Sequence, residues 1–227
     1  MKSICVTLVL LLTCLLTACQ IPTGKKTNLN ETISSTSQAS YTEQEKYQET
    51  SGETAQGIER WWLKRNENHQ TPEVSDHIDL SKYDAYYVNP KCKKKKIFLT
   101  FDCGYENGFT PKILDVLKKQ KVVAAFFVTK PFIREGTELV RRMKREGHIV
   151  GNHTVHHKSM PTLSDRDNKQ EIIDCAQYCK EATGYEMDHF IRPPMGEYNE
   201  KTLKLTKSMG YKTIFWSMAY VDFDVNK

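Results

Sequence analysis

The sequence predicts an α/β fold, with parallel strands and covering helices arranged either as an open sheet or as a closed barrel. Short runs of β-branched and aromatic residues alternate along the chain with amphipathic stretches, and the clearest run is apolar throughout, as in a strand covered on both faces. Polar motifs follow several of these runs directly. In a parallel barrel, the ends of the strands carry the catalytic groups.

Five strands are expected after the basic run at residues 91–96, namely at residues 97–101, 122–128, 148–151, 190–191 and 213–216.

Four helices are expected between these strands. The first has Thr110 as its N-cap and Pro111 at its first position, a favoured place for proline. Another begins at Ser164, which together with Asp167 resembles a capping box. The remaining boundaries follow from apolar periodicity and terminal glycines, and predict helices at residues 135–146, 164–184 and 199–209.

The N-terminus predicts a lipoprotein signal over residues 1–19. A short positive region precedes an apolar run that is short for a membrane span, and the sequence then reads Leu16-Thr17-Ala18-Cys19, which resembles a bacterial lipobox. Cys19 would become the lipidated first residue of a protein held outside the cytoplasmic membrane. An ordinary signal peptide or a buried strand is the alternative. Residues 20–57 lack large apolar groups, which predicts a disordered tether.

Residues 58–90 predict an irregular extension packed on the main domain, which covers residues 91–227. The Trp61-Trp62 pair in this extension is either a sugar-stacking platform or ordinary packing. The 227 residues suffice for one large domain with extras, and a net charge of +5 does not indicate a nucleic-acid surface. A monomer is expected. Cys175 and Cys179 lie four residues apart on a predicted helix, which favours two core residues over a disulfide.

Several residue types suited to hydrolytic chemistry follow the predicted strands. Asp102 follows the first strand. His153 and His157 follow the third, and a helical turn would place both imidazoles within reach of one metal ion, with His156 pointing elsewhere. The pattern lacks the glutamate of a zincin-type protease. Arg192 follows the fourth strand and can pair with a carboxylate, and Asp222 follows the fifth.

Each motif alone also fits a loop or a core contact, but their order is specific. TFDxG, HTxxH, RPPxG and then Trp-Ser…Asp resemble the NodB-type polysaccharide deacetylases. The stretches LTFDCGYENG, TPKILDVLKK, GHIVGNHTVHH and IFWSMAYVD are similar to the spore-cortex peptidoglycan deacetylases that act on N-acetylmuramic acid. The resemblance spans residues 58–222. It implies a distorted (β/α) barrel that hydrolyses N-acetyl groups of cell-wall glycan, with N-acetylglucosamine polymers as the alternative substrate.

The resemblance also implies roles for individual residues. Asp102 would be the general base that activates water, paired with Arg192, and Asp222 would help to hold that arginine. His153 and His157 would hold a divalent metal ion, with zinc expected. The backbone N–H of Met195 would face the developing oxyanion.

Two departures from the family pattern affect these expectations. The wider family has a second aspartate as third metal ligand where this chain has Cys103, so the site is either His₂Cys or one in which Cys103 ligates nothing. The late Leu-x-His motif that supplies the general acid is absent, and the last histidine is His189. The resemblance therefore predicts a C-terminally truncated domain without its last strands and helices. A non-catalytic glycan-binding protein or a non-functional remnant is the alternative.

Overall fold

The computed structural model describes residues 57–64, 70–74, 77–89, 91–92 and 96–219. All of them belong to one compact unit, Glu49–Lys227. Cys19, the predicted signal and nearly all of the predicted tether lie outside the described residues, and so does Asp222. None of the described helices is both long and apolar enough to cross a membrane.

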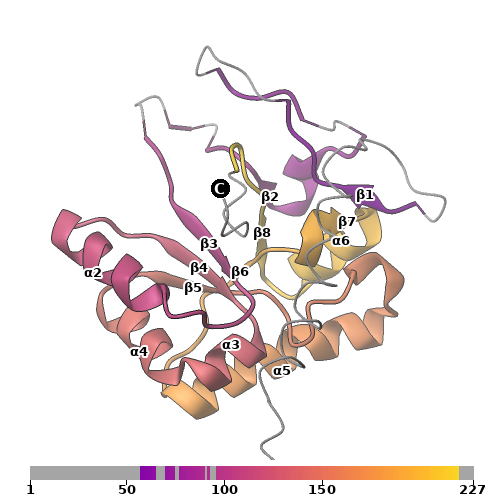
Figure 1. The fold of residues 1–227 in the computed structure, drawn as a ribbon. Coiled ribbons are helices and arrows are strands. Elements are labelled where there is room, and N and C mark those ends of the chain that lie inside the picture. Colours follow the sequence, from indigo (N-terminus) through magenta and orange to yellow (C-terminus); the bar gives the residue numbers. More distant parts are fainter. Residues whose placement is uncertain (1–56, 65–69, 75–76, 90, 93–95, 220–227) are drawn as a thin grey trace, which may run out of the picture. The chain divides into compact units, whose positions relative to one another are not determined.

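The fold is built on a six-stranded parallel sheet (Figure 1). Its strands in spatial order are β2 (Ala85–Tyr86), β8 (Lys212–Ile214), β6 (Phe190–Ile191), β5 (Ile149–Asn152), β4 (Ala125–Val128) and β3 (Thr100–Cys103). Every neighbouring pair is parallel, which confirms the predicted α/β class. Among the described residues the sheet is open, with β2 and β3 at its edges.

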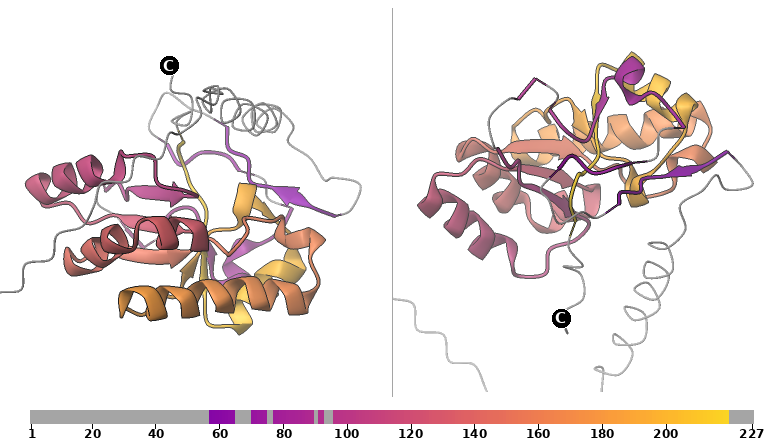
Figure 2. Two further views of the ribbon diagram at one scale, coloured as in Figure 1. Left: turned by 60° about the horizontal axis from the view of Figure 1, so that its bottom comes forward. Right: turned by 90° about the horizontal axis from the view of Figure 1, so that it is seen from above.

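Helices cover one side of the β3–β5 part of the sheet, and Figure 2 shows the same layer from two further directions. They are α2 (Thr110–Gln120), α3 (Lys130–Glu135), α4 (Thr137–Arg145) and α5 (Asp165–Thr183). The core between them joins Phe126 and Val128 of β4 to Met143 of α4 and to Cys175 and Cys179 of α5. The two cysteines are buried and unbridged, which confirms their predicted place in the core.

One helix was not predicted, and one predicted helix cap is wrong. The helix expected over residues 135–146 is present as α4, and it is preceded by Gly136, whose φ of −117° and ψ of 36° lie outside the helical region. The helix α3 before it was not predicted, and it begins after Thr129, whose side chain accepts a hydrogen bond from Phe132 N. Thr110 is the first residue of α2 and not its N-cap, which is Phe109.

The strands β3 and β4 begin later than predicted. Ile97, Phe98 and Leu99 precede β3 and are 79%, 65% and 41% exposed. β3 also extends to Cys103, past its predicted end at residue 101, so Asp102 lies within the strand. β4 likewise begins at Ala125, after an exposed stretch. The strands thus contain only residues that pair with a neighbouring strand.

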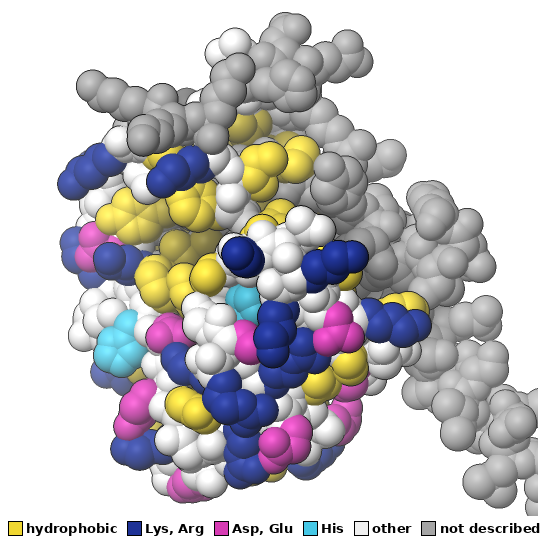
Figure 3. Space-filling view, turned by 90° about the vertical axis from the view of Figure 1, so that its left-hand side faces the viewer, with side chains coloured by type: hydrophobic (Ala, Val, Ile, Leu, Met, Phe, Trp, Pro, Cys, Tyr) yellow, Lys and Arg dark blue, Asp and Glu magenta, His cyan; other side chains and the backbone are white. Residues whose placement is uncertain are grey.

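Figure 3 shows hydrophobic side chains gathered on one face of the molecule, above a region rich in lysine and arginine.

The segment at residues 58–90 is built into the fold and is more ordered than expected. It supplies the edge strand β2 and also β1 (Glu59–Arg60), which pairs antiparallel with β7 (Glu197–Tyr198). Between them lies the short helix η1 (Leu80–Tyr83). Trp61 is 8% exposed, and its ring stacks on Phe215 with centroids 4.4 Å apart. Trp61 is therefore a packing residue and cannot serve as a sugar platform.

The C-terminal helix α6 (Glu200–Ser208) begins with a reciprocal cap, and it completes the layer beside β8. The side chain of Asn199 accepts from Thr202 N, while Asn199 N donates to Thr202 Oγ1. The predicted cap of α5 is also present, because Ser164 Oγ accepts from Asp167 N. These caps fix where α5 and α6 begin, close to the carboxyl ends of the strands.

Candidate active site

Arg192 lies at the centre of the site. It follows β6, is 3% exposed, and its guanidinium is hydrogen-bonded on several sides. Nη1 donates to Asp102 Oδ1 at 2.7 Å, which is the pair expected from the sequence. Nη2 donates to Thr100 Oγ1 at 2.9 Å, and Nε donates to the carbonyl of Ile214 at 3.0 Å.

These contacts also show that the sheet is curved. Arg192 binds β3 and β8, which are separated by β6, β5 and β4 in the strand order. In a flat sheet four strand spacings amount to about 19 Å, which one guanidinium cannot bridge. The sheet is therefore strongly curled around Arg192, as in the wall of a barrel.

Aromatic faces complete the surroundings of the guanidinium. The Arg192 Cζ atom lies 4.4 Å from the centroid of the Phe127 ring and 5.5 Å from that of Trp216. A planar guanidinium can stack on aromatic rings and still donate in its own plane, whereas a lysine ammonium would lose most of these contacts. The pocket is thus specific for arginine.

Asp102 presents a partly open carboxylate beside this buried charge. Its side chain is 40% exposed although its partner Arg192 is almost fully buried. Only Oδ1 is bound to Arg192, and the described residues give Oδ2 no hydrogen bond. The carboxylate is therefore held in orientation while one oxygen stays accessible to water.

His153 and His157 face each other, as the spacing predicts. Their Nε2 atoms are 3.1 Å apart and the rings are inclined at 70°. His153 Nδ1 lies 2.8 Å from the carbonyl oxygen of Arg192. Because a carbonyl only accepts, Nδ1 carries the hydrogen and His153 Nε2 is left with a lone pair. The main chain of Arg192 thus orients one histidine while its side chain holds Asp102.

The predicted helical turn between the two histidines is wrong. The residues from His153 to His157 form a loop, with Thr154 at φ 68° and His157 at φ 54°. The left-handed conformation at these residues brings the two rings together without a helix. The expectation for His156 is met, because its ring turns away and its Nδ1 lies 2.6 Å from Glu171 Oε1.

Both facing histidines are neutral near pH 7. Burial lowers the pKa of His153, and the attraction of Asp102 offsets this only in part. Burial and then the proximity of His153 lower the pKa of His157 to about 4. Neutral imidazoles are the protonation state that binds a metal ion, so the site needs no proton release to be competent.

The two histidines fit a divalent ion. Two nitrogens bound to one tetrahedral zinc ion lie about 3.4 Å apart, close to the observed separation. The carbonyl behind His153 is the kind of outer partner that orients metal-binding histidines. Among the described residues, however, no group of three or more His, Cys, Asp or Glu side chains is placed to hold an ion.

Cys103 is not brought to the histidines. Its side chain packs against the core cluster together with Phe101, whereas Asp102 between them faces the site, as strand alternation requires. Burial, with smaller contributions from Asp102 and Glu106, raises the pKa of the Cys103 thiol far above its usual range. The geometry thus gives no support to a His₂Cys centre and agrees with the alternative in which Cys103 ligates nothing.

Met195 lies in the turn η3 (Pro194–Gly196) after β6 and has a left-handed φ of 57°. Its backbone N–H has no acceptor among the described residues, as the predicted oxyanion role requires. Gly196 follows with φ 65°, and a Cβ there would lie 2.8 Å from the Trp216 ring. The glycine of the RPPMG motif is therefore needed for this turn to approach Trp216.

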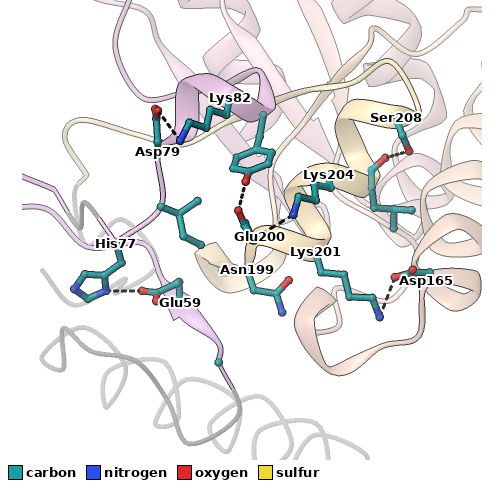
Figure 4. A pocket seen from close by; sticks show the side chains of 14 residues that line it. Glu59, His77, Asp79, Lys82, Asp165, Asn199, Glu200, Lys201, Lys204 and Ser208 are labelled. Atoms are coloured by element: carbon teal, nitrogen blue, oxygen red, sulfur yellow. Dashed lines mark hydrogen bonds and ion pairs between the residues drawn. The ribbon is translucent and has the colours of Figure 1, made fainter.

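A large cavity among the described residues lies elsewhere. It has a volume of about 1030 Å³ and lies between η1, β1 and α6 (Figure 4). Its charged side chains are already paired, among them Lys201 with Asp165, Lys204 with Glu200 and Lys82 with Asp79. None of the predicted site residues lines it. The candidate active site is therefore located by its side-chain chemistry and not by cavity size.

The chain is similar to known proteins over the segments that contain this site. The family model described as polysaccharide deacetylase matches residues 89–214. The chain belongs to the polysaccharide deacetylase family. The matched region contains the TFD, HTVHH and RPPMG segments and the strands β3 to β8.

Individual relatives extend the comparison. The peptidoglycan-N-acetylmuramic acid deacetylase PdaA of Bacillus subtilis is 44% identical over 168 residues, which cover 73% of this chain and 64% of that protein. The structure of B. subtilis PdaA, a family 4 carbohydrate esterase, superposes with a TM-score of 0.71 at 43% identity, covering 76% of this chain and 74% of that one. A peptidoglycan-N-acetylglucosamine deacetylase of Bacillus cereus is 35% identical, covering 63% of this chain and 52% of that protein.

Because the two facing histidines are neutral in the folded protein, we expect the free energy of unfolding to decrease in mild acid. His157 has a folded-state pKa of about 4, below the 6.5 expected when unfolded, so between these values the unfolded chain binds more protons. Stability should be intact above pH 6.5 and decrease by on the order of 2 kcal/mol toward pH 4. Urea unfolding at several pH values measures this. His157→Gln should flatten the decrease, and the exposed His189→Gln should retain the wild-type profile; equal profiles for all three proteins would contradict the assignment.

Proposed function

We propose that this chain removes N-acetyl groups from cell-wall glycan by hydrolysis. The observation that carries the proposal is the connected arrangement of Asp102, Arg192 and His153, with His157 facing His153. It combines an oriented, accessible carboxylate with a pair of neutral imidazoles. Membership of the polysaccharide deacetylase family supports the same reaction.

We propose N-acetylmuramic acid of peptidoglycan as the preferred sugar, with the spore cortex as its source. The supporting observation is the 44% identity to the B. subtilis muramic acid deacetylase, compared with 35% for the B. cereus enzyme named for N-acetylglucosamine. N-acetylglucosamine polymers are the alternative substrate. Both sugars carry the same acetamide group, so the catalytic residues are the same in either case.

In the proposed mechanism Asp102 is the general base. Its oxygen not bound to Arg192 takes a proton from water, and the water oxygen attacks the carbonyl carbon of the acetamide. Arg192 holds the carboxylate in place through Oδ1. The Met195 N–H donates to the carbonyl oxygen as negative charge develops there. The C–N bond then breaks, acetate leaves, and the protonated Asp102 returns its proton to the amine nitrogen of the sugar.

His153 and His157 would hold a divalent ion, and we propose zinc because imidazole nitrogens suit it. When bound, such an ion polarises the acetyl carbonyl and makes water more acidic. The role of the protein is to present one nitrogen lone pair from each histidine on the same side of a buried loop. The hydrogen bond from His153 Nδ1 to the carbonyl of Arg192 fixes one of them.

A non-catalytic glycan-binding protein is the second candidate. The packing of the Cys103 side chain against the core cluster favours it, because the position that holds the second aspartate of the wider family contributes no ligand here. A glycan-binding protein would keep the fold and the arrangement of side chains at the site but lack turnover. Acetate release separates the two candidates.

Replacement of Asp102 should abolish the reaction. Asp102→Asn keeps the size and one acceptor but cannot take up a proton, so acetate release from peptidoglycan with added zinc should fall by about 10² to 10⁴-fold. Asp115→Asn, which removes an exposed carboxylate of α2 paired with Arg142, is the control and should release acetate like wild type. Release that is unchanged in Asp102→Asn refutes the base assignment. A folded wild-type protein without release favours the glycan-binding candidate.

We also propose that Cys19 is lipidated and that residues 20–57 tether the domain outside the cytoplasmic membrane. The support is the lipobox-like sequence alone. In a bacterial host given labelled fatty acid, the wild-type protein should carry label and sediment with membranes. Cys19→Ser should lose both properties, whereas the neighbouring Cys14→Ser should keep them. Labelled Cys19→Ser protein would contradict the assignment.

A further inference from the structure

The loop that carries His153 and His157 is held in an unfavourable backbone conformation. Thr154 and His157 both have left-handed φ values although neither is glycine. A residue other than glycine holds this conformation only when its surroundings impose it. Since the facing histidine rings depend on this backbone, the groups that impose it control the site.

Five consecutive N–H groups of this loop can be accounted for individually. His153 N donates to the carbonyl of Val128, and Thr154 N donates to Asn152 Oδ1. His157 N donates to Thr154 Oγ1. The two remaining N–H groups, those of Val155 and His156, have no main-chain acceptor in the loop. Both donate to one carboxylate, that of Glu171.

Glu171 reaches the loop from the second turn of α5 and is 9% exposed. Its Oε2 accepts from Val155 N at 3.0 Å and from His156 N at 2.8 Å, while Oε1 lies 2.6 Å from His156 Nδ1. Two successive backbone N–H groups that converge on an anion form a strong, oriented contact. The carboxylate thus fixes the centre of the loop between the two histidines.

The rest of α5 makes this support rigid. Asn168, one turn earlier, donates to the carbonyl of Met160 beyond the loop, and the carbonyl of Ile172 accepts from Asn152 before it. Further along the same face, Cys175 and Cys179 are fully buried in the core. The helix is therefore anchored independently of the loop, and Glu171 transmits that anchorage to it.

We propose that Glu171 is a positioning residue that sets His153 and His157 facing each other for a divalent ion. The inference rests on the proposed function, because it assumes that the histidine pair binds metal. Glu171 does not touch the histidine nitrogens that face each other. It acts through the backbone of Val155 and His156, which lie between them.

Metal affinity of the full chain tests the proposal without relying on turnover. Zinc affinity is measured by calorimetry, and cobalt(II) absorption reports the geometry around the ion. Glu171→Ala should weaken zinc binding by about 10- to 100-fold, the range typical of lost outer partners, and should alter the cobalt spectrum. Glu171→Gln keeps one acceptor oxygen and should restore part of the affinity. Cys179→Ala, a buried change on the same face of α5 away from the loop, should bind metal like wild type.

The outcomes separate this inference from the proposed function. Wild-type affinity and spectrum in folded Glu171→Ala would overturn it, and so would equal losses in Glu171→Ala and Cys179→Ala. If Glu171→Ala does not fold, an unchanged Glu171→Gln would overturn it in the same way. A wild-type chain that binds neither metal also overturns it. Metal binding that is lost with Glu171, in a protein without acetate release, would support the inference while refuting the deacetylase proposal.

Discussion

The buried guanidinium of Arg192 is the interaction on which the rest of the site depends. Removing a charge from water costs several kcal/mol, and that cost is offset only when the charge is fully bonded. Arg192 meets this condition by binding β3 through Asp102 and Thr100 and β8 through the carbonyl of Ile214, between two aromatic faces. Because these strands are far apart in sheet order, satisfying one side chain requires the sheet to curl. The geometry of the site and the curvature of the sheet thus have a common cause.

A second dependence runs through α5. The main-chain carbonyl of Arg192 orients His153 from one side, and Glu171 fixes the loop between the histidines from the other. The left-handed residues of this loop are therefore stabilised by contacts that lie outside it. The histidine pair belongs to the packing of β5, β6 and α5 together, and a change in any of these elements should reach the site.

Sequence patterns predicted much of this arrangement, and the exceptions have physical reasons. The Asp102–Arg192 pair follows from the family resemblance, whereas the facing histidines and the capped α5 follow from residue type and spacing. The helical turn at HTVHH was wrong because spacing of four residues cannot distinguish a helix from a loop held by a remote carboxylate. Glu171 was missed for the same reason: its role arises only when α5 packs against the loop. Likewise, Ile97 is exposed because pairing with β4 begins only at Thr100, which the sequence pattern alone does not indicate.

We propose that His153 and His157, organised around Arg192, form the metal-binding part of a site in which Cys103 has no share. A crystal structure of the zinc-loaded protein, with anomalous data at the zinc edge, would locate the ion. We expect one zinc ion bound by Nε2 of His153 and of His157, with Asp102 still on Arg192 and Cys103 still packed against the core cluster. Zinc bound to the sulfur of Cys103, or absent from the two histidines, would contradict it.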